Sequence, residues 1–255
     1  MSGLAGLAAL CGGLDQTRPA STMTEYGPDT GSGRLPEHET TYRRLRDMLL
    51  FGALAPGQKV TIQGLVADLG AGMTPVREAI RRLTAEGALE PQGNRRVLVP
   101  RPCPALIEEL TFARLAIEPE LARRACARMG AGQIERLAAI DRQVDAAIAR
   151  DDVPAYLQGN FDFHFTLYDA AAAPVLRSLA QALWLRSGPS LRAVIETGGG
   201  QIGPDRHREA LEALTRGDAE ALARAIADDI RQGLGRISAQ VGQQPVDQEQ
   251  TGQHS

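Results

Sequence analysis

Apolar residues recur at helical spacing along most of this chain, and near its N-terminal end tight turns interrupt the pattern at two places. A turn at Pro56–Gly57 follows a first helix, which the spacing predicts over Thr40–Leu54. A second turn at Gly70–Gly72 separates two short helices, predicted over Ile62–Leu69 and Met73–Glu86. Helices this short are stable mainly through packing of one apolar face, so the three are expected to form one small domain.

The third predicted helix has a well-marked start and two distinct faces. Gly72 or Thr74 can cap it, and Pro75 lies in the first turn, where no amide hydrogen is needed. Its inward face is apolar: Val76, Ala79, Ile80 and Leu83. Its outward face is polar: Thr74, Arg77, Glu78, Arg81 and Arg82. The following segment, "GALEPQGNRRVLVPRP", predicts two short strands around a turn at residues 92–94.

Two short helices joined by a glycine turn and followed by a hairpin form a winged helix-turn-helix. In that fold the second short helix enters the major groove of DNA, where Arg can bind guanine or phosphate. Arg77 is the main candidate for reading a base, with Thr74 beside it. Arg95 and Arg96 on the hairpin are placed to touch the DNA backbone or an adjacent minor groove. The simpler alternative is a solvated helix face with a few salt bridges.

The distribution of charge favours the DNA-binding interpretation. Residues 39–101 hold ten Lys or Arg and six acidic residues, a net charge of +4. The whole chain carries −3, so the remainder carries −7. A basic module joined to an acidic one suits an anion-binding head on a separate body.

The N-terminal region resembles the DNA-binding domain of the GntR family. The resemblance rests on "YRRLRDMLLFGALAPGQKV" and "LVADLGAGMTPVREAIRRLTAEGALEPQGNRRVLV", which contain the family's "G-x-L-x-P-G", "T-P-V-R-E-A" and "L-x-x-x-G". Met73 stands where the family often has an Arg that contacts DNA, which implies weaker binding or a different operator. The expected DNA-binding residues are Gln63, Thr74, Arg77, Arg81, Arg95 and Arg96.

After Pro104 the spacing predicts about six helices, at 105–129, 131–150, 154–172, 174–197, 204–216 and 218–240. Five polar residues interrupt their apolar faces: Arg114, Asn160, His164, His207 and Asp229. Inward polar groups on several helices must pair with one another, line a cavity or bind a metal. Two His, an Asp and an Asn form a suitable ligand set for Zn, Mn or Ni. Separate hydrogen bonds within a core are the simpler alternative.

This C-terminal region resembles the FCD sensor domain of FadR-type regulators in the GntR family. The similar segments are "FARLAIEPELARRACARM", "NFDFHFTLYDAAA", "DRHREALEAL" and "GDAEALARAIADDI", and six helices rather than seven would indicate the VanR-like branch. The family often binds a divalent metal through one Asp and three His. These four positions are Asn160, His164, His207 and Asp229 here, so one Asp has become Asn and one His has become Asp. The resemblance implies a rearranged metal site, or an organic ligand bound by Arg114, Asn160, His164 and His207 without a metal.

The sequence therefore predicts a mainly α protein, with a winged helix-turn-helix at 39–102 and an all-α, FCD-like sensing and dimerisation domain at 103–240. Residues 1–38 and 241–255 are expected to be a disordered arm and tail, and Met23 could be the true start. The expected function is a regulator, by default a repressor, that binds double-stranded operator DNA as a homodimer and responds to a small carboxylate.

Two other classes of function stay open at this level. A metal-dependent enzyme could use His164, His207 and Asp229, although the chain has no GxSxG, HExxH or Walker motif, and a ligand-binding protein could have lost operator binding. We expect no catalytic activity. The three cysteines form no CxxC pair and no apolar run is long enough to span a membrane, so a cytoplasmic location without membrane contact is expected.

Overall fold

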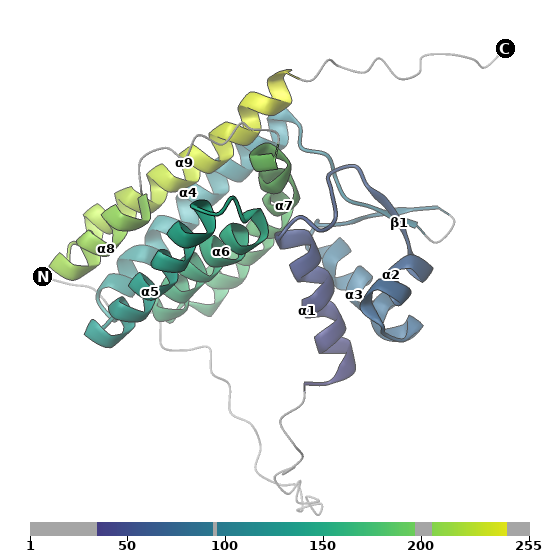
Figure 1. Ribbon diagram of the computed structural model, residues 1–255, viewed down its shortest axis with the longest axis horizontal. Coiled ribbons are helices and arrows are strands. Elements are labelled where there is room, and N and C mark those ends of the chain that lie inside the picture. The colour runs from purple at the N-terminus through teal and green to yellow at the C-terminus, as the bar shows by residue number, and fades with distance from the viewer. Residues whose placement is uncertain (1–34, 94–95, 197–205, 244–255) are drawn as a thin grey trace, which may run out of the picture. The chain divides into compact units, whose positions relative to one another are not determined.

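The computed structural model describes residues 35–93, 96–196 and 206–243 (Figure 1). Within these ranges the head comprises α1 (Glu37–Leu50), β1 (Lys59–Thr61), α2 (Ile62–Leu69), α3 (Met73–Ala85), β2 (Glu90–Gln92) and β3 (Arg96–Leu98). The body comprises α4 (Pro104–Cys126), α5 (Ala131–Ile148), α6 (Val153–Ala170), α7 (Pro174–Glu196), α8 (Arg206–Arg216) and α9 (Ala219–Gln243). The fold is therefore mainly helical, with an N-terminal winged helix-turn-helix and a C-terminal helical domain, as the sequence predicts.

Capping residues mark the start and end of α2 and the start of α3. The Thr61 hydroxyl accepts a hydrogen bond of 3.0 Å from the Gly64 amide at the start of α2. Helix α2 ends at Leu69, and the C-cap residue Gly70 has a φ of 56°, in the left-handed region that glycine adopts without strain. Gly72 is the N-cap residue of α3 and makes no side-chain cap hydrogen bond. The expectation that Thr74 could cap α3 is wrong, because Thr74 is already the second residue of the helix.

The wing contains one strand more than the hairpin that the sequence predicts. Strand β1 pairs antiparallel with β3, and β2 pairs with the other edge of β3, so the order is β1-β3-β2. Val97 at the centre of β3 is opposite Val60 on one side and Pro91 on the other, and it is buried. Strand β1 is only three residues long, which leaves too little alternation for it to be recognised from sequence.

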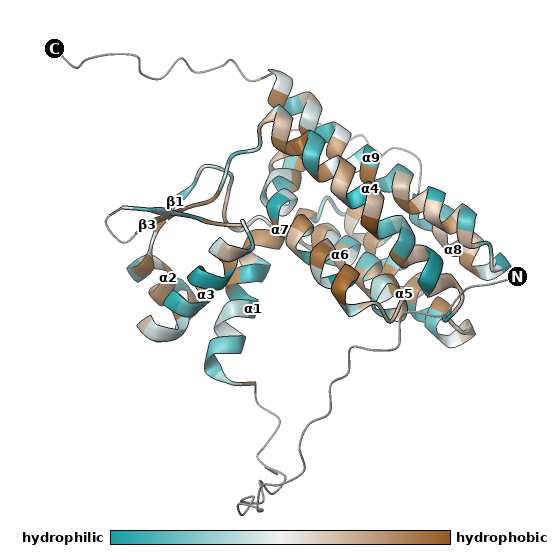
Figure 2. Ribbon diagram, turned by 180° about the vertical axis from the view of Figure 1, so that it is seen from behind, coloured by the Kyte–Doolittle hydropathy of each residue, from teal (hydrophilic) through white to brown (hydrophobic). Residues whose placement is uncertain are grey.

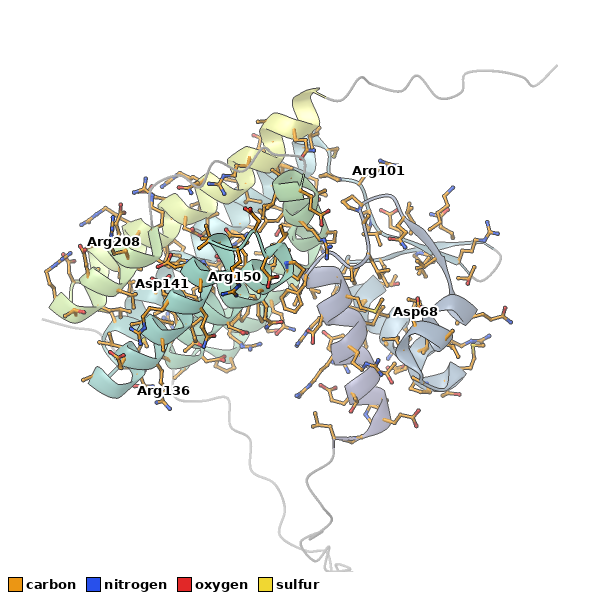
Figure 3. The ribbon with its side chains drawn as sticks, viewed as in Figure 1. Asp68, Arg101, Arg136, Asp141, Arg150 and Arg208 are labelled. Atoms are coloured by element: carbon orange, nitrogen blue, oxygen red, sulfur yellow. The ribbon has the colours of Figure 1, made fainter. Side chains whose placement is uncertain are left out.

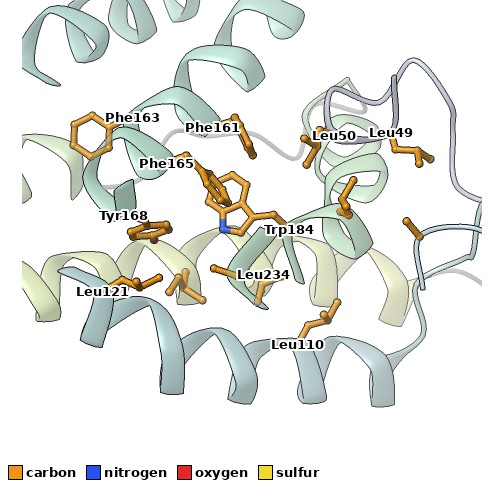
Figure 4. Close-up of a cluster of buried hydrophobic side chains, with 14 of the residues drawn as sticks. Leu49, Leu50, Leu110, Leu121, Phe161, Phe163, Phe165, Tyr168, Trp184 and Leu234 are labelled. Carbon is orange, nitrogen blue, oxygen red and sulfur yellow. The ribbon is translucent and has the colours of Figure 1, made fainter. Parts of the chain in front are cut away.

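The body is a bundle in which α4 and α9 lie side by side for much of their length (Figure 1). Hydrophobic and hydrophilic residues alternate along its helices (Figure 2), and most of the buried residues are apolar. Its core includes an aromatic group of Phe161, Phe165, Tyr168 and Trp184, contributed by α6 and α7 (Figure 4). These large side chains exclude water around the polar residues of the same helices, which determines the chemistry described below.

Several helix ends differ from the predicted ones by a few residues. Helix α1 begins three residues before the predicted Thr40 and ends at Leu50, and Leu54 is buried in the turn that follows. Helix α9 extends to Gln243, into the range predicted as a tail. The arm at 1–34, the tail at 244–255, and Asn94 and Arg95 on the wing lie outside the described residues.

Candidate DNA-binding surface and buried polar site

The exposed face of α3 carries one arginine that no other described side chain engages. Thr74 and Arg77 are both exposed, and the Arg77 guanidinium has no hydrogen bond or ion pair with another described residue. Arg81 is exposed as well, but its guanidinium is 2.6 Å from the Glu78 carboxylate. Met73, the first residue of the helix, is 39% exposed and offers an apolar surface where a guanidinium would offer charge. Arg77 is therefore the side chain on this face that is most available to contact a DNA base.

Arg82 belongs to the packing between helices rather than to this exposed face. Its guanidinium lies 3.6 Å from the centre of the Tyr42 ring and 2.9 Å from the Glu39 carboxylate, both on α1. The Tyr42 hydroxyl donates a 2.8 Å hydrogen bond to Glu86. Burial and this hydrogen bond raise the pKa of Tyr42 to about 12, while hydrogen bonding from Arg82 lowers the pKa of Glu39. The prediction that Arg82 belongs to the outward face is thus wrong, because Tyr42 and Glu39 hold it against α1.

The other predicted DNA contacts are exposed where the structure describes them. Gln63 is exposed in the first turn of α2, and Arg96 is exposed at the start of β3. Arg95 is outside the described residues, as noted above. Gln63, Thr74, Arg77, Arg81 and Arg96 are therefore all accessible, and their contacts with DNA stay predictions.

The polar residues predicted to face inward meet at one place in the body. His164 on α6, His207 on α8 and Asp229 on α9 each place one potential ligand atom within 4.8 Å of the other two. His164 is fully buried, His207 is nearly so, and the Asp229 side chain is 24% exposed. Asn160 precedes His164 by one helical turn and is buried too. Residues far apart in sequence thus converge, as the inward spacing on each helix predicts.

The His207 ring is held so that only one of its nitrogen atoms is available to this cluster. Its Nδ1 is 2.9 Å from the carboxylate of Asp141 on α5, a residue that the sequence analysis did not select. Figure 3 labels Asp141 in the helical body. The ring also stacks on Phe163, with centroids 3.9 Å apart. A carboxylate that accepts the Nδ1 proton leaves Nε2 with a lone pair, the form that binds a metal ion.

The His164 ring is fixed in the same tautomer by a different chain of hydrogen bonds. The Tyr168 hydroxyl donates its proton to Glu118 over 2.7 Å, and it lies 3.1 Å from His164 Nδ1. Because the hydroxyl has one proton, Nδ1 must be the donor to its oxygen, and Nε2 is left with a lone pair. Burial lowers the pKa of His164, so its ring is neutral near pH 7.

A buried lone pair then faces a negatively charged group. His164 Nε2 is 3.1 Å from the Asp229 carboxylate, yet it has no hydrogen-bond partner among the described residues. A buried nitrogen lone pair beside a carboxylate is unfavourable unless a cation binds both. These residues therefore have the chemistry of a metal site.

Arg114 is buried, as predicted, and its charge is balanced inside the protein. Its guanidinium donates to both Glu118 oxygens, at 2.6 and 3.1 Å, and lies 4.4 Å from the centre of the Trp184 ring. Glu118 also accepts a 3.1 Å hydrogen bond from Trp184 Nε1 and the one from Tyr168. Glu118 therefore connects Arg114 to the hydrogen bonds that orient His164. The i,i+4 spacing of Arg114 and Glu118 is a sequence signal that could have identified this pair.

A cavity lies beside the cluster, enclosed mainly by α6, α7 and α9. Its polar lining includes three residues that the sequence analysis selected: Arg114, Asn160 and Asp229. It also includes three residues that were not selected: Tyr156, Gln232 and Arg236. These three lie near helix surfaces, so hydropathy alone does not distinguish them from solvated residues. The cavity reaches the cluster through Asp229 and Asn160, and neither histidine is among its lining residues.

Comparison with known proteins agrees with both halves of this architecture. A family model described as "Bacterial regulatory proteins, gntR family" matches residues 37–99, and one described as "FCD domain" matches residues 109–232. The HTH-type transcriptional regulator McbR of Escherichia coli (strain K12) is 26% identical over 214 residues, which is 80% of this chain and 95% of McbR.

Solved structures share the fold at lower identity. The structure of E. coli McbR/YncC has a TM-score of 0.75 at 24% identity and covers 81% of this chain and 99% of its own. A GntR transcriptional regulator from Rhodococcus sp. RHA1, described as putative, has a TM-score of 0.65 at 21% identity, covering 82% and 99%. Of the helices that the structure describes, none has the length and apolar character needed to cross a membrane.

The winged head and the helical body with its buried polar site define a class of protein, the DNA-binding transcriptional regulators with a separate sensor domain. The chain belongs to the GntR family, with a C-terminal FCD domain of the kind found in FadR-like regulators. Its homologues are transcriptional regulators, which are not enzymes.

Proposed function

We propose that this protein represses transcription from a nearby operon by binding an operator through α3 and the wing, and that a small organic acid bound in the body changes this affinity. The observation that carries the proposal is the exposed, unengaged guanidinium of Arg77 on a helix whose opposite face is buried. A side chain in that position can donate two hydrogen bonds to guanine in the major groove.

A gel-shift experiment with the DNA that flanks the protein's own gene tests operator binding. The folded full-length protein is expected to shift this DNA at low salt and to shift unrelated DNA of the same length much less. Absence of a shift by folded protein would overturn the proposed function. A shift that weakens or strengthens on addition of an organic acid would support the response to a ligand.

A divalent metal, Zn, Mn or Ni, is the second part of the proposal. His164, His207 and Asp229 would hold it, with Asn160 nearby as a weaker oxygen ligand. The unpartnered Nε2 of His164 and the two oriented rings support this assignment. Such an ion would neutralise Asp229, connect α6, α8 and α9, and supply positive charge to the cavity. Together these effects would couple ligand binding to the packing of the bundle.

Metal content can be measured directly by elemental analysis of protein purified without chelator. We expect about one divalent ion per chain, and much less in a His164→Ala variant. Finding no metal, with no uptake of added Zn, Mn or Ni, would remove this part of the proposal and leave the operator-binding part standing.

A homodimer is the third part, since two recognition helices could then bind two half-sites of an operator. Its support is the exposure of large apolar side chains on α4 and α7, two helices that pack against each other. Phe112 on α4 is 77% exposed, and Val175 and Leu179 on α7 are 71% and 49% exposed. Exposed apolar side chains on neighbouring helices are typical of a surface that another protein covers.

A further inference from the structure

Two large apolar side chains are exposed in the described part of the head, and one of them lies on α3. Met73 is 39% exposed, and the other such residue, Leu35, precedes α1. Met73 is the first residue of α3, directly after the N-cap residue Gly72. Contact between a long apolar side chain and water is unfavourable, so a partner that covers Met73 would gain affinity from it.

The position of Met73 places it at the end of α3 that is expected to reach DNA bases. In a helix-turn-helix the N-terminal residues of the second helix contact base edges in the major groove. Arg77 follows Met73 by four residues, so the two side chains are neighbours on one face of the helix. Thr74 lies beside them, and all three residues are exposed. Met73 is therefore continuous with the proposed DNA-binding surface.

This end of α3 is better suited to a base than to a phosphate group. The Glu37 carboxylate accepts a 3.3 Å hydrogen bond from the Gly72 amide. It places negative charge where a helix N-terminus would otherwise attract an anion, so it opposes the approach of a phosphate. The Met73 side chain has no hydrogen-bond donor for a phosphate oxygen either. A base edge is therefore the part of DNA that Met73 can contact favourably.

Thymine is the base that presents an apolar group in the major groove. Its 5-methyl group lies there, whereas guanine, adenine and cytosine present hydrogen-bond donors and acceptors. A Met side chain that covered those polar edges would remove their hydrogen bonds to water and replace none of them. A methyl group has no such bonds to lose, and the flexible Met side chain can adjust to its position.

We propose that Met73 selects thymine at one position of each operator half-site by packing against its 5-methyl group, next to the base pair that Arg77 contacts. This inference rests on the proposed function, because it requires α3 to lie in the major groove of the operator. It adds a sequence preference to operator binding. Burial of one methyl group corresponds to a change in affinity of roughly fourfold.

Replacement of thymine by deoxyuridine tests this in the operator that the gel shift identifies. Deoxyuridine pairs with adenine as thymine does and lacks only the 5-methyl group. Each thymine in the DNA that the full-length protein protects is replaced in turn, and fluorescence anisotropy measures the dissociation constant. We expect a position at which the replacement weakens binding at least about threefold. If no thymine responds, the proposal is wrong.

Variants of the head assign this response to a side chain. Met73→Ala is expected to bind the thymine and deoxyuridine operators equally, and Met73→Leu to retain part of the difference. Thr74→Ser is the matched control on α3, because it removes a methyl group from an exposed neighbour and keeps the hydroxyl. Leu35→Ala removes the other exposed apolar side chain, and both controls should respond like the wild type.

Two outcomes with these variants would overturn the role of Met73. One is a Met73→Ala protein that still distinguishes the two operators, and the other is a loss of the difference in Thr74→Ser instead. Because Met73 and Thr74 are exposed, their variants should unfold at the temperature of the wild type. A lost response then reflects the missing contact rather than misfolding.

A second pair of DNAs separates a methyl contact from an effect of DNA shape. At the responsive position, cytosine is compared with 5-methylcytosine, which presents a methyl group in the major groove as thymine does. The wild type should bind the methylated DNA more tightly, and Met73→Ala should bind both equally. If the two proteins respond to methylation alike, the preference comes from the shape of the DNA and the proposal is wrong.

The gel shift on the same preparations separates this inference from the proposed function. Wild-type protein that shifts operator DNA but shows no response that depends on Met73 contradicts the inference alone. Folded protein that shifts no operator DNA contradicts the proposed function instead.

Discussion

Arg77 is the single residue on which operator recognition is expected to depend most, because its guanidinium is exposed and unengaged by other described residues. Replacing it with Ala should weaken specific binding by about 1–3 kcal/mol if it reads a base. Fluorescence anisotropy with specific and unrelated DNA measures this loss. Arg81→Ala is the matched control on the same helix, and we expect a smaller loss because Arg81 is paired with Glu78. Equal losses on both DNAs would mean that Arg77 contacts phosphate rather than a base.

Tyr168 is the residue expected to orient His164, the proposed metal ligand. The Tyr168→Phe variant removes the hydroxyl that accepts the Nδ1 proton and donates to Glu118. Metal affinity should fall about 10- to 100-fold, the usual effect of losing such an outer partner, and competition with a chelator measures it. Tyr42→Phe is a matched control, since it also removes a tyrosine-to-glutamate hydrogen bond, in the head. Unchanged metal affinity in Tyr168→Phe would show that His164 is oriented by other means.

At the scale of elements, the contact between α5 and α6 depends on the absence of a side chain at Gly159. A Cβ at this position would lie 2.8 Å from a methyl group of Val144, whose χ1 angle has little freedom in a helix. Gly159→Ala should therefore lower the free energy of unfolding by about 1–3 kcal/mol. Gly235→Ala on α9 meets no atom and should instead raise it by about 0.5–1 kcal/mol. Urea denaturation compares the two, and a stabilised Gly159→Ala would indicate that the helices move apart easily.

The packing of α1 against α3 is expected to depend on pH through Glu39. Arg82 and Arg43 hold the pKa of Glu39 below its usual value, so this carboxylate stabilises the fold while it is ionised. That contribution is complete above the unfolded pKa of about 4.3 and is lost as the pH falls through the lower, folded value. Wild type should therefore be more stable than Glu39→Gln at pH 7, with the difference shrinking below about pH 4. A difference independent of pH would contradict this.

For the whole molecule, the exposed apolar residues of α4 and α7 predict a dimer. Phe112→Glu should shift the protein toward a monomer in analytical ultracentrifugation, because a charge would be buried in the contact. The same variant should bind the operator more weakly, since one head reaches only one half-site. Phe112→Leu is the control that keeps an apolar side chain. A Phe112→Glu protein that stays dimeric would place the interface elsewhere.

Local patterns explain how much of this protein could be predicted. Helical spacing, Gly70 and the residues around Thr74–Ala79 indicate the winged head, because they depend on interactions within one turn or one helix. The same spacing identifies His164 and His207 as inward. Strand β1 was not predicted, since it exists only through pairing with β3, a partner distant in sequence.

The sequence by itself determined which faces of the helices are apolar and which polar residues interrupt them, since both follow from periodicity along one helix. Only the tertiary structure decided what those polar residues contact. Glu118 neutralises Arg114, Asp141 orients His207, and Tyr42 removes Arg82 from the DNA-binding face. The physical reason is that hydrogen bonds and ion pairs between helices depend on how the helices pack, and a single helix does not specify its partners.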